Sequence, residues 1–280
     1  MALQMSLEIK KFLPLLRFEP TARRVRADSA GRTVVDSDRA VLVWEARRLT
    51  PVFAVPADDI AAELVPCTDS QERREAGFRL EAGGASLMDP RTRFRRHTCD
   101  GEEFTVRVEG NELVGAAFRP ADPDLAGHVL LDFAAFDRWR EEEQVIEGHP
   151  RDPFHRVDAR ASSRKVRAEY AGVVLADSST PVFVYETMLP VRAYFSRAAV
   201  NWDRLVRSDL QTVCPYKGRA SYWSVPGDDP AGRDIAWSYE QTLPDAEQLA
   251  GLVAFYDERA NVFVDGELTK PGTTPWSRLP

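Results

Sequence analysis

The sequence predicts a mainly β protein with minor α content, built as two tandem copies of one small domain. Residues 23–45 match residues 164–186 at a constant offset of 141, with 11 identities in 23 positions. Residues 125–129 and 249–253 share a second, shorter match, now at an offset of 124, so the first copy holds 17 more residues between the matches. Short β-branched and aromatic runs recur in both copies, without the strand–helix alternation of a doubly wound fold.

The two matches and the local composition divide the chain into five segments. Two prolines and a glycine between Gly148 and Pro153 discourage both helix and strand and predict a linker. We therefore expect an N-terminal arm or extra edge element at 1–22, a first repeat at 23–147, a linker at 148–162, a second repeat at 163–266 and a C-terminal tail at 267–280.

The elements of the second repeat follow from residue alternation and turn signals. Residues 166–170 alternate apolar and polar, Gly172 permits a tight turn, and residues 173–175 continue an extended run. Buried strands are predicted from the β-branched and aromatic runs at 182–185 and 193–195. Ser196 is a candidate N-cap for a short helix over 196–206. Further strands are expected at 220–225, 235–239, 252–256 and 262–264.

Composition excludes several classes of protein. A net charge of −7 argues against nucleic acid as a partner, and no apolar run approaches the roughly 20 residues that a membrane span needs. Three widely spaced cysteines suit reduced thiols, and the N-terminus is not a convincing secretory signal, so we expect a cytoplasmic protein. All four histidines precede the second repeat, which is therefore expected to have none.

The two copies differ most at residues 212–223, TVCPYKGRASYW, which have no counterpart in the first repeat. In an extended chain Lys217, Arg219 and Ser221 would share one face and form an anion cradle for a phosphate or carboxylate. Gly218 would let backbone approach the ligand. Planar groups would stack on three aromatic residues, Tyr216, Tyr222 and Trp223. The alternative is that the aromatic residues belong to the core and the cations are solvated.

Two candidate reactive groups flank this motif. Neighbouring cations are expected to favour the Cys214 thiolate, and Glu186 ends the strand that precedes the motif. Arg167 and Trp237 are further candidates for ligand contact. Glu186 and Arg167 have matches at the same offset in the first repeat, so an architectural role is the alternative for both. Residues 97–100, HTCD, resemble half a metal site, but without a second ligand pair we expect a surface loop.

The motif also carries a family resemblance. The pattern V-R-x-x-x-x-G-x-x-x-A-D-S, then C-P-Y-K-G-x-A-x-Y-W and A-W-S-Y, resembles the domain of unknown function 427 family, also filed under a nucleotidyltransferase-like label. The full pattern spans residues 164–266, and the first repeat matches only its opening and closing parts. The resemblance implies small, mostly β domains of the Mss4-like or β-tent group. Many members of that group bind zinc through CxxC pairs; this chain has none, so no metal is expected. The sequence also lacks a P-loop and a tight aspartate pair.

These observations predict a small-molecule site in the second repeat. Whether the protein is an enzyme stays open, and the sequence indicates no cofactor. The alternatives are a non-catalytic binding module, a scaffold, or a thiol-dependent redox role of Cys214, suggested by β-tent relatives that reduce methionine sulfoxide. The duplication further predicts that the two repeats pack on each other as a pseudo-dimer.

Overall fold

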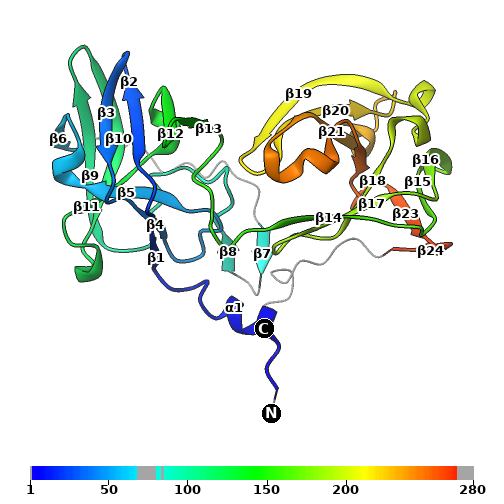
Figure 1. Ribbon diagram of the computed structural model, residues 1–280, viewed down its shortest axis with the longest axis horizontal. Helices are drawn as coiled ribbons and strands as arrows, with labels where there is room; N and C mark the ends of the chain where they lie inside the picture. The colour runs from blue at the N-terminus through cyan, green and yellow to red at the C-terminus, as the bar shows by residue number, and fades with distance from the viewer. Residues whose placement is uncertain (1, 68–79, 83–84, 270–280) are drawn as a thin grey trace. The chain divides into compact units, whose positions relative to one another are not determined.

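The computed structural model describes residues 2–67, 80–82 and 85–269. The chain divides into two compact units, unit 1 up to Asp152 and unit 2 from Pro153 on. Both units are mainly β, as predicted (Figure 1). The described helical segments are the helix α1 (Met5–Lys10) and short 3-10 turns: η1 (Ala57–Asp59), η2 (Pro123–Leu125), η3 (Phe133–Ala135), η4 (Arg197–Ala199), η5 (Trp202–Arg204), η6 (Pro230–Gly232) and η7 (Pro244–Leu249).

Unit 1 contains a seven-stranded and a four-stranded antiparallel sheet, and a separate hairpin of β7 (Leu80–Ala82) and β8 (Ala85–Leu87). In spatial order the large sheet consists of β1 (Arg17–Pro20), β4 (Val41–Trp44), β5 (Val52–Pro56), β11 (His128–Leu131), β10 (Asn111–Pro120), β9 (Gly101–Val108) and β6 (Glu63–Pro66). The small sheet consists of β13 (Gln144–Ile146), β12 (Arg138–Glu141), β2 (Val25–Ser29) and β3 (Arg32–Ser37).

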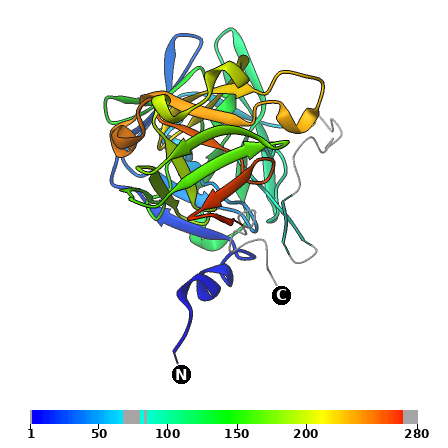
Figure 2. The same ribbon diagram turned by 90° about the vertical axis from the view of Figure 1, so that its right-hand side faces the viewer.

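Unit 2 repeats this topology; its last two strands are the red strands of Figure 2. The large sheet consists of β14 (Val157–Ala161), β17 (Val182–Glu186), β18 (Arg192–Phe195), β22 (Val253–Phe255), β21 (Ala236–Thr242), β20 (Gly218–Ser224) and β19 (Val206–Cys214). The small sheet consists of β16 (Val173–Ser178), β15 (Val166–Tyr170), β23 (Asn261–Val264) and β24 (Glu267–Leu268). The order of strands within each sheet corresponds to that of unit 1, with the small sheet of unit 2 given from the opposite edge.

The opening hairpins show why the duplicated sequence folds alike. Ala30 and Gly31 connect β2 to β3 with φ of 51° and 75°, and Ala171 and Gly172 connect β15 to β16 with φ of 48° and 78°. Two consecutive positive φ values give the hairpin turn whose twist matches that of its strands. The pairing register also shifts at the equivalent place, after Ala27 in one copy and after Ala168 in the other.

Each large sheet is covered by apolar side chains on both faces. In β4, Leu42 and Trp44 join a core shared by the two sheets, which we call the intersheet core. Val41 and Val43 belong instead to a cluster on the opposite face, which we call the outer core. The same alternation places Phe183 in the intersheet core of unit 2 and Val184 in its outer core. Strand periodicity therefore points the next residue of this series, Glu45 or Glu186, towards the outer core.

Two expectations from the sequence are corrected, at 148–162 and at 196–206. The segment 148–162 is not only a linker, because β14 lies within it and pairs with β17 at the edge of the unit 2 sheet. The N-terminal segment 1–22, for which we expected an arm or an extra edge element, supplies β1, the edge strand beside β4. No α-helix spans 196–206: the short turns η4 and η5 precede β19 there, since the segment has only a partial apolar face to stabilise a helix.

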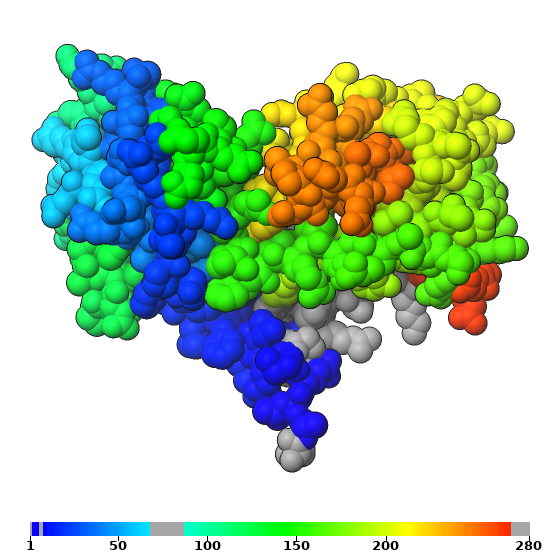
Figure 3. Space-filling view, viewed as in Figure 1, coloured from blue at the N-terminus to red at the C-terminus, as the bar shows by residue number. Residues whose placement is uncertain are grey.

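The largest difference between the units is the connection between matching strands. In unit 1, residues 67–100 connect β6 to β9, whereas in unit 2 the three residues 215–217 connect β19 to β20. The motif CPYKG therefore marks a tight turn at the end of a hairpin. On the outer-core face of the same sheet, η7 lies against β21 and β14; η7 and β14 are orange beside green in Figure 3.

Candidate functional site

A buried carboxylate occupies the end of β17. The side chain of Glu186 is 8% exposed, because strand alternation directs it towards the outer core. A carboxylate without partners in such surroundings would cost several kcal/mol, so it must be paired or protonated. Two ionisable side chains from distant parts of unit 2 provide the pairing.

Lys217 and His155 each bind one oxygen of this carboxylate. The Lys217 ammonium, carried by the turn between β19 and β20, donates to Oε2 and forms a salt bridge. His155 Nε2 lies 3.1 Å from Oε1. The pairing of β14 with β17, in which Val157 faces Glu186, brings the preceding histidine alongside. We call Glu186, Lys217 and His155 the unit 2 cluster.

The pKa shifts in this cluster favour an ion pair. Burial raises the pKa of Glu186, but the hydrogen bond from His155 and the charge of Lys217 outweigh burial and lower it overall. Burial lowers the pKa of Lys217, but the opposite charge of Glu186 more than compensates and raises it. Both groups are therefore charged at neutral pH.

Aromatic side chains surround the cluster. Tyr216 stacks on the His155 ring, with the ring centroids 4.1 Å apart and the planes inclined by 22°. Lys217 Nζ lies 5.7 Å from the centroid of the Tyr239 ring. Tyr194 is almost fully buried and accepts a hydrogen bond of 3.1 Å from Trp237 Nε1. Burial raises the pKa of Tyr194 to about 12, so its phenol stays protonated.

The Cys214 thiol does not have the character that the sequence predicts. Burial raises its pKa and outweighs the opposing charge of Lys217. The expected thiolate is therefore disfavoured, because the neighbouring cation is already paired with Glu186. The thiol packs at the margin of the outer core instead.

The prediction that the Lys217 and Arg219 side chains lie on the same face of the strand is also wrong. Lys217 is 8% exposed and points to Glu186, whereas the Arg219 side chain is exposed. The prediction assumed an extended chain from Cys214 onward, but the chain reverses at 215–217 and Cys214 pairs with Gly218. The alternation of faces is therefore reset at the turn.

The remaining predicted residues separate by sheet face. Tyr222 and Trp237 lie in the outer core with the cluster. Trp223 lies in the intersheet core and meets Trp202 edge-on at 5.4 Å. Ser221 accepts a hydrogen bond from Arg207.

The other two predicted positions have structural explanations. Arg167 lies in the small sheet, pairs with Glu169 at 2.8 Å and covers the Phe263 ring. Gly218 has φ of +105°, and a Cβ there would lie 2.5 Å from the Gln241 carbonyl oxygen. The close approach at Gly218 is therefore to the neighbouring strand β21.

His155, Tyr194 and Tyr239 escaped prediction. Unit 2 does contain a histidine, because its first strand lies in the segment that we assigned to the linker. The repeat offset carries a signal: adding 141 to residues 17–20 gives 158–161, the body of β14. These edge strands share no identical residues, so comparison of the copies alone did not reveal them.

Unit 1 holds a matching carboxylate with different partners. Glu45 is fully buried, and its Oε2 lies 3.1 Å from His97 Nδ1 and 3.7 Å from Arg48 Nε. The Thr98 amide donates to Oε1 at 2.7 Å. We expected segment 97–100 to be a surface loop, but it is not exposed along its whole length, because the His97 side chain is only 5% exposed. We call Glu45, His97 and Arg48 the unit 1 cluster.

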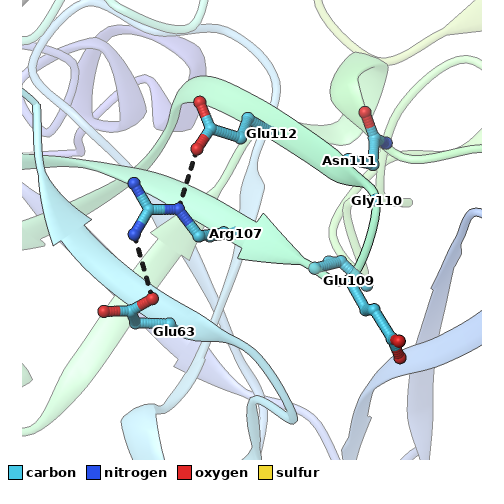
Figure 4. A pocket seen from close by; sticks show the side chains of 7 residues that line it. Glu63, Arg107, Glu109, Gly110, Asn111 and Glu112 are labelled. Atoms are coloured by element: carbon cyan, nitrogen blue, oxygen red, sulfur yellow. Dashed lines mark hydrogen bonds and ion pairs between the residues drawn. The ribbon is translucent and has the colours of Figure 1, made fainter.

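Figure 4 shows a surface hollow elsewhere in unit 1, at the turn between β9 and β10. Arg107 bridges Glu63 and Glu112 there, at 3.1 and 2.8 Å. None of the predicted site residues lines this hollow. In the described part of the chain, no group of three or more His, Cys, Asp or Glu side chains is arranged to hold a metal ion. None of the described helices is long and apolar enough to cross a membrane.

Comparison with known proteins identifies a family. No curated protein matches the chain. The model of the domain of unknown function 427 family matches residues 17–79 and 158–266. The matched segments contain both buried glutamates and the CPYKG turn, whereas His97 and His155 lie outside them. Because the match covers more than half of the sequence, the chain belongs to the domain of unknown function 427 family.

Proposed function

We propose that unit 2 binds a small phosphate- or carboxylate-bearing ligand at the unit 2 cluster. The observation that carries the proposal is the buried Lys217 ammonium, which shares the Glu186 carboxylate with His155. An ammonium has three donors, and the bond to Glu186 uses one of them. The ligand's anionic group would accept from Lys217, while Tyr216 and Trp237 offer aromatic surface.

Energetic considerations favour a working cluster over a purely architectural one. A buried ion pair seldom stabilises a fold more than apolar residues of similar volume would. Buried groups with shifted pKa values gather preferentially at functional sites. Within unit 2, the pKa values of Glu186 and Lys217 are shifted in opposite directions, and Glu186 also contacts a histidine.

An acid–base reaction is the catalytic form of this proposal. Glu186 holds the His155 ring through Nε2, which leaves Nδ1 as the nitrogen able to exchange a proton with a ligand. Glu186 then acts as a positioning residue. The raised pKa of Cys214 disfavours it as nucleophile or redox group. A nucleotidyltransferase reaction finds little support, because the cluster offers one carboxylate, already paired with Lys217, and no carboxylate pair for two metal ions.

The test is a thermal-shift screen with inorganic phosphate, small carboxylates and nucleotides. Loss of Lys217 alone would leave Glu186 buried without a cation, so the informative variant is the double substitution Glu186→Gln with Lys217→Met. We expect an anion to stabilise the wild type and Arg219→Ala, and to leave the double variant unaffected. A screen in which the double variant responds like the wild type would refute the proposal. Equal loss in Arg219→Ala would restore the cradle that the sequence predicted.

The non-catalytic module and the scaffold remain the competing functions. A ligand that binds without chemical turnover supports the module, and the absence of any response supports the scaffold. The β-tent relationship, the pseudo-dimer and the cytoplasmic location also stay predictions.

A further inference from the structure

A second surface hollow of unit 1 lies next to the unit 1 cluster. It is lined by residues from the end of the long connection, the start of β9 and one aromatic side chain of β10: His97, Thr98, Cys99, Asp100, Gly101, Glu103 and Phe118. It is distinct from the hollow of Figure 4, with which it shares no residue. His97 therefore connects this hollow to the buried carboxylate of Glu45.

The His97 ring is held in a fixed orientation. Its plane stacks on Phe118 with centroids 3.6 Å apart and an inclination of 9°, and Phe94 meets it edge-on at 5.1 Å. Nδ1 is engaged by Glu45 at 3.1 Å. Two aromatic contacts and one hydrogen bond leave the imidazole little freedom to turn.

The other ring nitrogen has no partner. His97 Nε2 is buried and makes no hydrogen bond to any described residue, although the whole side chain is only 5% exposed. An unsatisfied buried polar atom costs about 1–3 kcal/mol, so such an atom in a native protein calls for a partner: water, an ion or a ligand.

The tautomer follows from the partner of Nδ1. Burial raises the pKa of Glu45, but the hydrogen bonds from His97 and from the Thr98 amide, together with the charge of Arg48, lower it overall, so the group is a carboxylate at neutral pH. A carboxylate only accepts hydrogen bonds, so in the neutral ring the proton is on Nδ1. Nε2 then presents a lone pair and requires a donor.

The charge of the hollow selects the kind of donor. Asp100 and Glu103 line it, and no lysine or arginine is among the described lining residues. Arg95 pairs with Glu103 at 2.9 Å, which leaves Asp100 as the exposed carboxylate of the lining. Burial, together with Glu45, raises the pKa of Cys99 to about 12, so this thiol adds no negative charge at neutral pH.

We propose that this hollow binds a small organic cation bearing an N–H donor, a primary amine, whose ammonium donates to His97 Nε2 and faces Asp100. The site is independent of the ligand site proposed in unit 2. Where unit 2 presents a cation in its cluster, unit 1 presents a lone pair beside acidic groups. The two repeats would thus bind oppositely charged ligands.

The test uses two probes of equal charge on the full chain. Ethanolamine carries an ammonium with N–H donors, whereas tetramethylammonium carries the charge without any donor. Long-range proton–nitrogen correlation spectra resolve the ring nitrogens of the four histidines. We expect ethanolamine to shift the His97 Nε2 resonance in a saturable manner, and tetramethylammonium to leave it in place. Equal shifts from both probes, or no saturable shift, would overturn the proposal.

Variants locate the binding. His97→Gln should abolish the stabilisation by ethanolamine in a thermal-shift assay, and His155→Gln should retain it.

If His97→Gln does not fold, Asp100→Asn provides the test, because the Asp100 side chain is exposed and outside the cluster. We expect Asp100→Asn to weaken ethanolamine binding about fivefold, as loss of an exposed charge pair does. The matched change Asp124→Asn, at an exposed acid outside the hollow, should have no effect. Equal weakening by both changes would show long-range charge attraction and refute the site.

Discussion

Glu45 and Glu186 are equivalent residues that obtain their partners in different ways. Glu186 is the last residue of the second strand of its large sheet, and Glu45 directly follows the equivalent strand. Each is buried beside a histidine and a cation. Unit 1 takes its cation from the next turn of the chain and its histidine from the long connection, whereas unit 2 takes them from the CPYKG turn and from the entry to β14. The strand fixes the carboxylate, and the surrounding loops supply whatever neutralises it.

The largest expected effect comes from breaking the ion pair of unit 2. Lys217→Met leaves the Glu186 carboxylate buried without its cation and should destabilise unit 2 by about 3–5 kcal/mol. Adding Glu186→Gln should recover most of that loss, because the described hydrogen bond of Lys217 is to Glu186. Hydrogen exchange of the β17 and β18 amides in urea measures the free energy of unfolding of this unit.

The same pair of changes in unit 1 sharpens the contrast. Arg48 also donates to the backbone carbonyl of Arg96 at 3.0 Å, so Arg48→Met with Glu45→Gln leaves that oxygen without its donor. Recovery should therefore be incomplete in unit 1. Full recovery in both units would mean that the two clusters are energetically alike.

The second prediction compares two turns. Gly218→Ala should cost about 3 kcal/mol, because the new Cβ meets the Gln241 carbonyl at 2.5 Å and φ is +105°. Gly172→Ala should cost only about 1 kcal/mol, since its φ is +78° but nothing lies within 4 Å. Denaturant unfolding of both variants checks the difference. Equal costs would show that the contact with β21 is relieved without strain.

How much of the fold and of the two clusters the sequence could predict depends on how far apart in the sequence the interacting residues lie. The β class and the equivalence of Glu45 and Glu186 follow from duplication and from alternation within a strand, both of which are local. His155 reaches Glu186 through the pairing of β14 with β17, and His97 reaches Glu45 through a connection of more than 30 residues. Nothing local in the sequence encodes either encounter. The prediction of the strand face on which Lys217 lies was wrong for a related reason: the turn at 215–217 interrupts the alternation of side chains between the two faces.

The third prediction concerns pH. The lowered pKa of Glu186 contributes stability that is present above its unfolded value of about 4.3 and is lost as pH falls through the folded value. The raised pKa of Lys217 contributes stability that is present below about 10.4 and is lost as pH rises through the folded value. Unit 2 should therefore lose stability at both extremes, and Glu186→Gln with Lys217→Met should flatten both limbs.

Unit 1 should respond to pH on one side only. The pKa of Glu45 is lowered, which gives the same acid limb. Burial lowers the pKa of Arg48, and the opposing charge of Glu45 does not restore it, so deprotonating Arg48 cannot produce the alkaline loss expected of Lys217. An alkaline loss in unit 1 that Arg48→Met removes would contradict this assignment. Amide exchange resolved by unit against pH gives the measurement.

The smallest effect is expected at the two thiols beside the clusters. Cys99 donates to Glu45 Oε1 at 3.7 Å, and burial with this carboxylate raises its pKa to about 12. Burial also raises the pKa of Cys214, but there Lys217 acts in the opposite direction. The rate of iodoacetamide alkylation of each thiol, measured against pH, gives its pKa as the midpoint of the curve. Limited access of the reagent lowers the rate at every pH and leaves the midpoint unchanged. Glu45→Gln should lower the midpoint of Cys99 and leave that of Cys214 in place. A Cys99 midpoint near the ordinary value of about 8.5 would mean that the carboxylate lies too far from the thiol to act on it, and the likeness between the two clusters would then be confined to their glutamate, histidine and cation.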